Sequence, residues 1–197
     1  MKPLTKKESE LLLVLCKDYS KNYNANSIST LIGITARGAL KILKNLYAQH
    51  LLIRKQYGKA TFYKINYDDD YAKKLVSTLL MQEAKERSSR WIAEFRGLFK
   101  DTEIIILFGS TLKKPEHAKD VDVIMVFKKK KYTKVMDFIE QKNKILLKPI
   151  HAIIQTPKDL PKNLNSKNPA ALNAIRDGIV LYGSDRLVEV LKDVTSF

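Results

Sequence analysis

Two short clusters in the second half of the sequence carry residue types that can do chemistry. Gly109 and Ser110 follow directly on the apolar run 104–108, and Asp120 and Asp122 stand at the head of a second apolar run. A glycine lets the backbone approach a phosphate closely, and a serine hydroxyl adds a hydrogen-bond donor. The two clusters together indicate a phosphate site close to a pair of carboxylates.

The spacing of the two aspartates predicts a metal site. Alternate residues of a strand point to one face, so Asp120 and Asp122 should project together while Val121 and Val123 turn into the core. Neighbouring carboxylates repel each other unless a cation lies between them. Carboxylate oxygens suit Mg²⁺, which commonly binds one or two carboxylates together with substrate phosphates. We therefore predict Mg²⁺ as the cofactor, with Asp120 and Asp122 as its ligands.

A strand ending in Gly109-Ser110, nine further residues, and Asp120-Val121-Asp122 opening a second strand resemble the signature of the DNA polymerase beta-like nucleotidyltransferase superfamily. The likeness is closest to its small members, the minimal nucleotidyltransferases, and covers roughly residues 102–190. It implies that Gly109 and Ser110 bind an NTP and that Asp120 and Asp122 are catalytic through bound metal. The implied reaction transfers a nucleoside monophosphate to a hydroxyl. The alternative is a chance Gly-Ser turn with a surface pair of aspartates.

The third strand, expected over residues 146–154, departs from this pattern. Active members of the superfamily usually carry a third carboxylate there, which completes metal binding and helps to deprotonate the attacking hydroxyl. No Asp or Glu occurs from Ile145 to Thr156, and His151 lies where the acid is expected. His151 is either a neutral base or metal ligand, or a histidine with a structural partner. The sequence leaves both interpretations open, and with them the question of catalytic activity.

Helices and turns complete this half of the chain. A helix is expected over 133–144, and a helix, a glycine and a final strand over 171–184. The run Lys128–Lys131 is interpreted as a solvated loop, with attraction of nucleic acid or nucleotide to the mouth of the site as the alternative.

The N-terminal part of the chain alternates helix and strand patterns. Thr5 and Glu8 form a capping box that opens the first helix, and a short helix is expected from Ser27 to Ile32, with Gly33 in the turn after it. Thr35 is expected to cap a longer helix whose inward residues are predicted to be Leu40, Leu43, Leu46 and Tyr47. Two β-prone runs, 51–56 and 60–65, then predict a hairpin.

This order of elements resembles the winged helix-turn-helix modules of bacterial and archaeal regulators, over residues 5–66. The resemblance implies duplex DNA as a partner, with the longer helix in the major groove and the hairpin wing on the backbone or minor groove. The alternative is a winged helix that serves protein interaction or dimerisation. By position, the residues implied to contact DNA are Thr35, Arg37, Lys41, Lys44, Arg54, Lys55 and Lys59.

The charge distribution agrees with a polyanionic partner. The chain has a formal net charge of +15. Residues 1–66 hold twelve Lys and Arg against three Asp and Glu, a net +9, whereas residues 67–101 balance to zero and residues 102–197 reach +6. Such a balance favours nucleic acid or nucleotides as ligands. A lysine-rich host proteome is the other explanation.

We predict an α+β protein of two domains. A winged helix DNA-binding domain occupies residues 1–66, a connecting helical segment 67–101, and a nucleotidyltransferase-like α/β domain with a small mixed sheet 102–197. Asp68–Asp70 should open the connecting helix, which continues, with a possible break, to about Lys100. This segment is also a candidate dimerisation element.

Three functions remain open at this point. The first is Mg²⁺-dependent transfer of NMP from NTP, directed or regulated by the DNA-binding domain. The second is transcription regulation by a DNA-binding protein whose degenerate transferase domain senses nucleotide or dimerises. The third is an antitoxin-like role beside a separate toxin-like protein. Because the longest apolar runs are far below about 18 residues and the single cysteine, Cys16, looks like a core residue, we expect a cytoplasmic protein without membrane contact.

Overall fold

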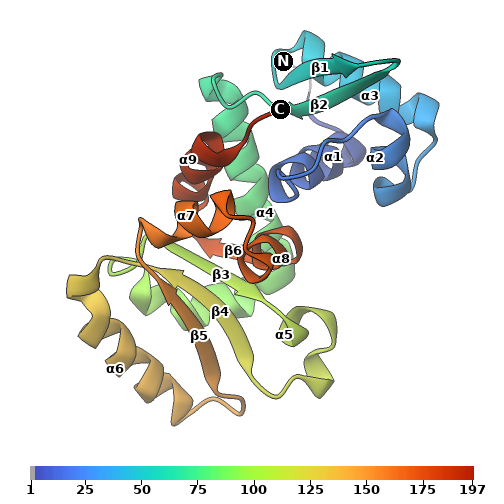
Figure 1. Ribbon diagram of the computed structural model, residues 1–197. Helices are drawn as coiled ribbons and strands as arrows, with labels where there is room; N and C mark the ends of the chain where they lie inside the picture. The colour runs from blue at the N-terminus through green and yellow to red at the C-terminus, as the bar shows by residue number, and fades with distance from the viewer. Residues whose placement is uncertain (1–2) are drawn as a thin grey trace.

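The computed structural model describes residues 3–197, so the first two residues of the predicted 1–66 domain lie outside it. The predicted α+β class with a small mixed sheet is confirmed: a four-stranded sheet and a separate two-stranded sheet are joined by helices (Figure 1). We call residues 3–66 the N-terminal unit and residues 102–197 the sheet unit. None of the helices in the described part of the chain is both long and apolar enough to cross a membrane.

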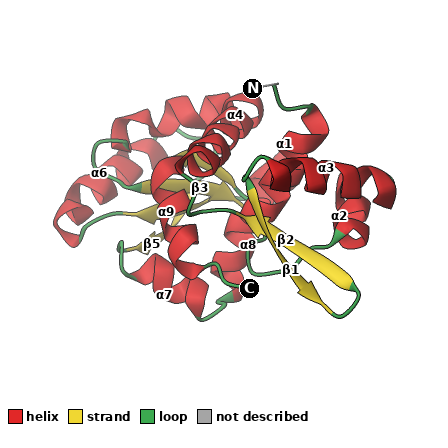
Figure 2. Ribbon diagram, turned by 90° about the horizontal axis from the view of Figure 1, so that it is seen from above, coloured by secondary structure: helices red, strands yellow, loops and turns green. Residues whose placement is uncertain are grey.

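The N-terminal unit consists of helices packed beside a hairpin. Its strands pair antiparallel, from Leu52 opposite Ile65 to Tyr57 opposite Ala60, around a turn at Gly58. Figure 2 shows the hairpin extending outward from the helices. The elements are α1 (Lys6–Lys17), α2 (Ala25–Ile32), α3 (Ala36–Ala48), β1 (Leu52–Tyr57) and β2 (Ala60–Ile65).

Side-chain caps fix where the first helices begin. The capping box of Thr5 and Glu8 is confirmed, and Thr35 caps α3 by accepting a hydrogen bond from the Gly38 amide at 3.1 Å. The second helix begins at Ala25 rather than at the predicted Ser27, because the Asn24 side chain accepts from the Ser27 amide and so caps an earlier start.

The predicted inward face of α3 is partly wrong. Leu43 and Leu46 are buried, but Leu40 and Tyr47 are each 37% exposed. Ala39 is buried in their place. The buried stripe is therefore narrower than the apolar residues of the helix suggest, and Tyr47 is left at the surface.

The connecting segment is helix α4 (Asp70–Phe95), which Asp69 caps. The break expected in this helix occurs at Ser88, whose backbone angles are φ −148° and ψ 31°. The helix packs against α1 of the N-terminal unit and against a strand and a helix of the sheet unit, so it joins the two parts rather than spacing them.

The sheet unit is built on strands in the order β5-β4-β3-β6, with β4 and β5 parallel and the other pairs antiparallel. The strands are β3 (Ile104–Phe108), β4 (Val121–Val126), β5 (Ile150–Gln155) and β6 (Ile179–Tyr182). The helices are α5 (Ser110–Lys113), α6 (Tyr132–Asn143), α7 (Asp159–Asn165), α8 (Pro169–Asp177) and α9 (Ser184–Val194). Three short 3-10 turns are η1 (Arg96–Leu98), η2 (Pro115–His117) and η3 (Lys129–Lys131).

The third strand of the sequence analysis, expected from residue 146, starts only at Ile150. Its neighbour β4 begins at Val121, the partner of Ile150, so the residues before Pro149 have no strand beside them. Pro149 also has no amide hydrogen to donate to a ladder. Leu147 consequently lies in a loop and is 98% exposed.

Both faces of the sheet are covered by helices, as Figure 2 shows from above. Ile105 and Leu107 pack in one cluster with residues of α4 and α6, whereas Ile104 and Ile106 pack in another with residues of α7, α8 and α9. The alternation along β3 follows the period of two that sends successive side chains to opposite faces.

The second of these clusters continues into the N-terminal unit without interruption, through buried residues of α1 and α4. The hydroxyl of Tyr19 donates to the Leu164 carbonyl at 3.1 Å, and Lys17 pairs with Glu83 at 2.9 Å. The two parts of the chain therefore share one hydrophobic core.

Truncation of Leu164 tests this shared core. Its side chain is 1% exposed, so Leu164→Ala should lower the free energy of unfolding by about 2–5 kcal/mol. Urea unfolding followed by far-UV circular dichroism and by Trp91 fluorescence should give one coincident transition, shifted as a whole. The exposed Leu147→Ala is the matched control and should change stability by less than about 0.5 kcal/mol. Two separate transitions, with only one of them shifted, would contradict a shared core.

Candidate metal site

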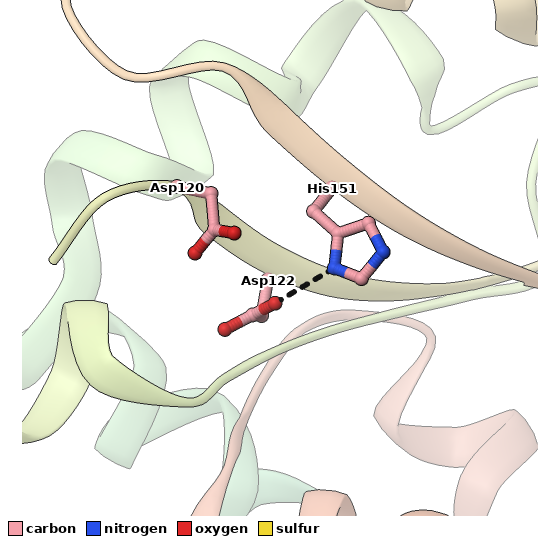
Figure 3. A group of neighbouring side chains, drawn as sticks. All are labelled: Asp120, Asp122 and His151. Atoms are coloured by element: carbon pink, nitrogen blue, oxygen red, sulfur yellow. Dashed lines mark hydrogen bonds and ion pairs between the residues drawn. The ribbon is translucent and has the colours of Figure 1, made fainter.

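The fold brings Asp120, Asp122 and His151 together at one end of the sheet (Figure 3). Asp122 on β4 lies opposite Phe108 on β3 and opposite His151 on β5. Asp120 directly precedes β4. One ligand atom from each of the three side chains lies within 4.8 Å of the others. Among the described residues this is the one group of at least three His, Cys, Asp or Glu side chains close enough together that they could hold a metal ion.

The contacts inside this group are few. His151 Nδ1 lies 3.0 Å from Asp122 Oδ1, and the two side chains are 64% and 20% exposed. The Asp120 backbone carbonyl accepts a hydrogen bond from the Thr111 hydroxyl at 2.8 Å, whereas the Asp120 carboxylate makes no hydrogen bond or ion pair with any of residues 3–197. The Asp120 carboxylate is partly buried and lies beside a second carboxylate, yet in a chain with 36 Lys and Arg none of those among residues 3–197 pairs with it. Its negative charge is therefore available to a cation.

Gly109 lies directly against the side chain of Asp122. Its backbone has φ +80° and ψ −152°, and a Cβ built on it would lie 2.2 Å from Asp122 Oδ2. No other residue type fits there without moving Asp122. Ser110 follows as the first residue of α5 and is exposed. The structure therefore places the two predicted phosphate-binding residues beside the predicted metal-binding residues.

An ionic contact fixes the far end of α5. Lys113 Nζ lies 2.9 Å from Asp177, the last residue of α8, which also pairs with Arg176 at 2.9 Å. The Arg176 guanidinium and then Lys113 hold the pKa of Asp177 down, to about 2. No local sequence pattern pointed to Lys113 or Asp177, because the contact joins residues 64 positions apart.

The lysine run at 128–131 lies away from this site. It follows the C-terminal end of β4, whereas Asp120 precedes the N-terminal end. Lys128, Lys129 and Lys130 are exposed, and Lys131 pairs with Asp101 at 2.6 Å. The position favours the interpretation as a solvated loop over a role at the mouth of the site.

All seven residues implied to contact DNA are exposed on α3 and the hairpin. Arg37, Lys41 and Lys44 recur at helical spacing along one side of α3. On the hairpin, the Arg54 guanidinium lies 4.4 Å from the centre of the Tyr47 ring. Tyr47, expected in the core, thus supports a basic side chain at the surface. In Figure 1 these elements lie at the opposite end of the molecule from the four-stranded sheet.

We compared the chain with protein families, characterised proteins and solved structures, and no family model, protein or structure matched it. The functional interpretation therefore depends on the residue pattern and on the geometry of the site.

A substitution at Gly109 tests its contact with Asp122. Gly109→Ala should lower the free energy of unfolding by about 1–3 kcal/mol more than Gly58→Ala, measured by urea denaturation. Gly58 is the matched control because its φ is also positive, +57°, while a Cβ there meets nothing within 4 Å. In an Asp122→Ala background the extra cost of Gly109→Ala should fall, and the part that remains reflects the backbone angles φ +80° and ψ −152°, which strain any residue with a Cβ. An equal cost of the two glycine substitutions would argue against the contact.

Proposed function

We propose that the chain is a nucleotidyltransferase-like protein that binds an NTP and a divalent cation at Gly109, Ser110, Asp120 and Asp122. In the same proposal the N-terminal unit is a winged helix that binds duplex DNA. The observation that carries the proposal is the Asp120 carboxylate, which has no protein partner within the described chain and lies in one cluster with Asp122 and His151. The backbone at Gly109, in contact with Asp122, supports it.

The residues fit a divalent cation. Asp120 and Asp122 supply carboxylate oxygens, the donor type that Mg²⁺ and related ions take in proteins. A bound cation of this kind neutralises charge on a triphosphate during phosphoryl-type transfer. The absence of a side chain at Gly109 leaves backbone facing the cluster, and the exposed Ser110 hydroxyl is free to donate to a phosphate oxygen.

In the reaction proposed, an acceptor hydroxyl oxygen forms a bond to the α-phosphorus of the NTP. The bond from that phosphorus to the bridging oxygen breaks, pyrophosphate leaves, and the hydroxyl proton passes to a base. The chain's contribution is to position the triphosphate and to hold negative charge close to a cation, which is most of what such reactions need from a protein.

The DNA-binding part of the proposal is supported by exposed cations on α3 and the hairpin. Such side chains neutralise backbone phosphates, and this contribution depends strongly on salt. Because the two parts share a core, DNA bound at α3 would lie in a fixed orientation relative to the Asp120–Asp122 cluster.

Removal of one carboxylate charge tests the transferase activity. Asp120→Asn keeps the shape of the side chain but removes its charge, so metal-dependent transfer should fall by about 10²-fold or more. The measurement is transfer of label from each of the four NTPs to protein, RNA and DNA acceptors, with Mg²⁺ or Mn²⁺. Asp137→Asn, at an exposed position of α6, is the matched control and should leave the rate unchanged. Absence of turnover by the unsubstituted protein with every combination would refute the activity.

His151 favours a second candidate function. It occupies the strand position where the resemblance places a third carboxylate, so the site is compatible with nucleotide binding without turnover. The chain would then be a DNA-binding transcriptional regulator in which this site senses nucleotide or supports dimerisation.

DNA binding is common to both functions and can be tested alone. Reversal of Arg37, Lys41 and Lys44 to Glu should weaken binding to duplex DNA at least about tenfold. It should also reduce the slope of log affinity against log salt by about 2–3. Reversal of Lys128, Lys129 and Lys130 is the matched control, because it removes the same charge from an exposed loop. Equal losses in the two variants would show a general charge effect instead of a binding face on α3.

A further inference from the structure

We propose that His151 is a metal ligand, and that it makes the site selective for a divalent transition-metal ion such as Mn²⁺ over Mg²⁺. The inference rests on the proposed function only in taking Asp120 and Asp122 to hold a cation. It then names the class of cation and assigns His151 a role that differs from the third carboxylate of the resemblance.

The distance between His151 and Asp122 fits two ligands of one ion. Ligand atoms about 2.1 Å from a metal, at a right angle to each other, lie about 3.0 Å apart. His151 Nδ1 and Asp122 Oδ1 are separated by 3.0 Å. Asp120 supplies a third ligand atom within 4.8 Å of the other two, which small side-chain rotations can bring onto the same ion.

A purely structural role for His151 explains its position poorly. The side chain is 64% exposed, and its single polar contact with residues 3–197 is the one with Asp122. Exposed pairs of this kind contribute little to stability, typically about 0–1 kcal/mol. Without an ion, Nδ1 donates its proton to the Asp122 carboxylate, which can only accept. Because the other side of the ring is open to water, Nε2 can carry the proton instead, and Nδ1 would then offer its lone pair to a bound ion.

The donor set decides the class of ion. Two carboxylates and a neutral imidazole carry one negative charge less than three carboxylates, which lowers the attraction for Mg²⁺. Mg²⁺ prefers oxygen ligands, whereas the nitrogen of imidazole suits first-row transition metals. The exchange of a carboxylate for His151 therefore keeps the number of ligands and changes which ion is bound.

The test measures binding of metal to the whole protein without any turnover. Mn²⁺ alone is titrated and followed by the loss of the free-ion EPR signal, and Mg²⁺ is measured by its displacement of bound Mn²⁺. We expect Mn²⁺ to bind at least about tenfold more tightly than Mg²⁺ in the unsubstituted protein. Pulsed EPR should detect coupling of Mn²⁺ to an imidazole nitrogen.

Variants at His151 give the expected changes. His151→Asp should keep Mn²⁺ binding, lose the nitrogen coupling and shift the Mn²⁺/Mg²⁺ affinity ratio at least about fivefold toward Mg²⁺. His151→Ala should lose the coupling and weaken Mn²⁺ binding. His50→Asn is the matched control: His50 lies outside the cluster, and its φ of +60° is one that asparagine tolerates, so both measurements should be unchanged.

The outcomes separate this inference from the proposed function. Bound Mn²⁺ without nitrogen coupling, an unchanged affinity ratio in His151→Asp, or no binding of Mn²⁺ would each overturn it. If Mg²⁺ supports NTP transfer and bound Mn²⁺ shows no nitrogen coupling, the proposed activity stands and the inference about His151 is wrong. If bound Mn²⁺ shows nitrogen coupling but the protein turns over no NTP, the inference about His151 stands and the proposed activity is wrong.

Discussion

The site depends on the pairing register of β4 between β3 and β5. Asp122 meets the Gly109 turn on one side and His151 on the other only because it lies opposite Phe108 and His151 in the two ladders. A slip of one residue would turn Asp122 into the cluster formed with α4 and α6. Val121 and Val123, both fully buried on that face, oppose such a slip by their own burial.

A second constraint, the shared core, links this site to the rest of the chain. The cluster that covers the β3 face bearing Ile104 and Ile106 continues through α8 into α1 and α4. A ligand that moved the N-terminal unit would therefore have to disturb buried packing close to the sheet. Interiors packed in this way transmit displacement instead of absorbing it, so the proposed DNA binding and the proposed metal binding would be mechanically connected.

Local pattern predicted much of this arrangement, and distant pairing accounts for the rest. The run at β3 is continuously apolar, the run at β4 is apolar after Asp122, and the period of a strand is enough to align Asp120 with Asp122. The contact between Asp122 and His151 could not be predicted from local pattern, because these residues are 29 positions apart and meet only through the parallel register of β4 and β5. The predictions that the third strand starts at residue 146 and that Tyr47 is buried were wrong for the same reason. Each is decided by what lies beside the segment in space.

The local geometry argues that His151 changes the site instead of marking its decay. One feature of the cluster costs free energy of folding: a carboxylate pair in which Asp120 has no basic partner in the described chain. A site without a ligand gains nothing from this pair, since an asparagine at either position would relieve the repulsion. A cation relieves the repulsion directly, and the imidazole at 3.0 Å from Asp122 supplies it with a further ligand. This cost supports the proposal that the three side chains hold an ion together.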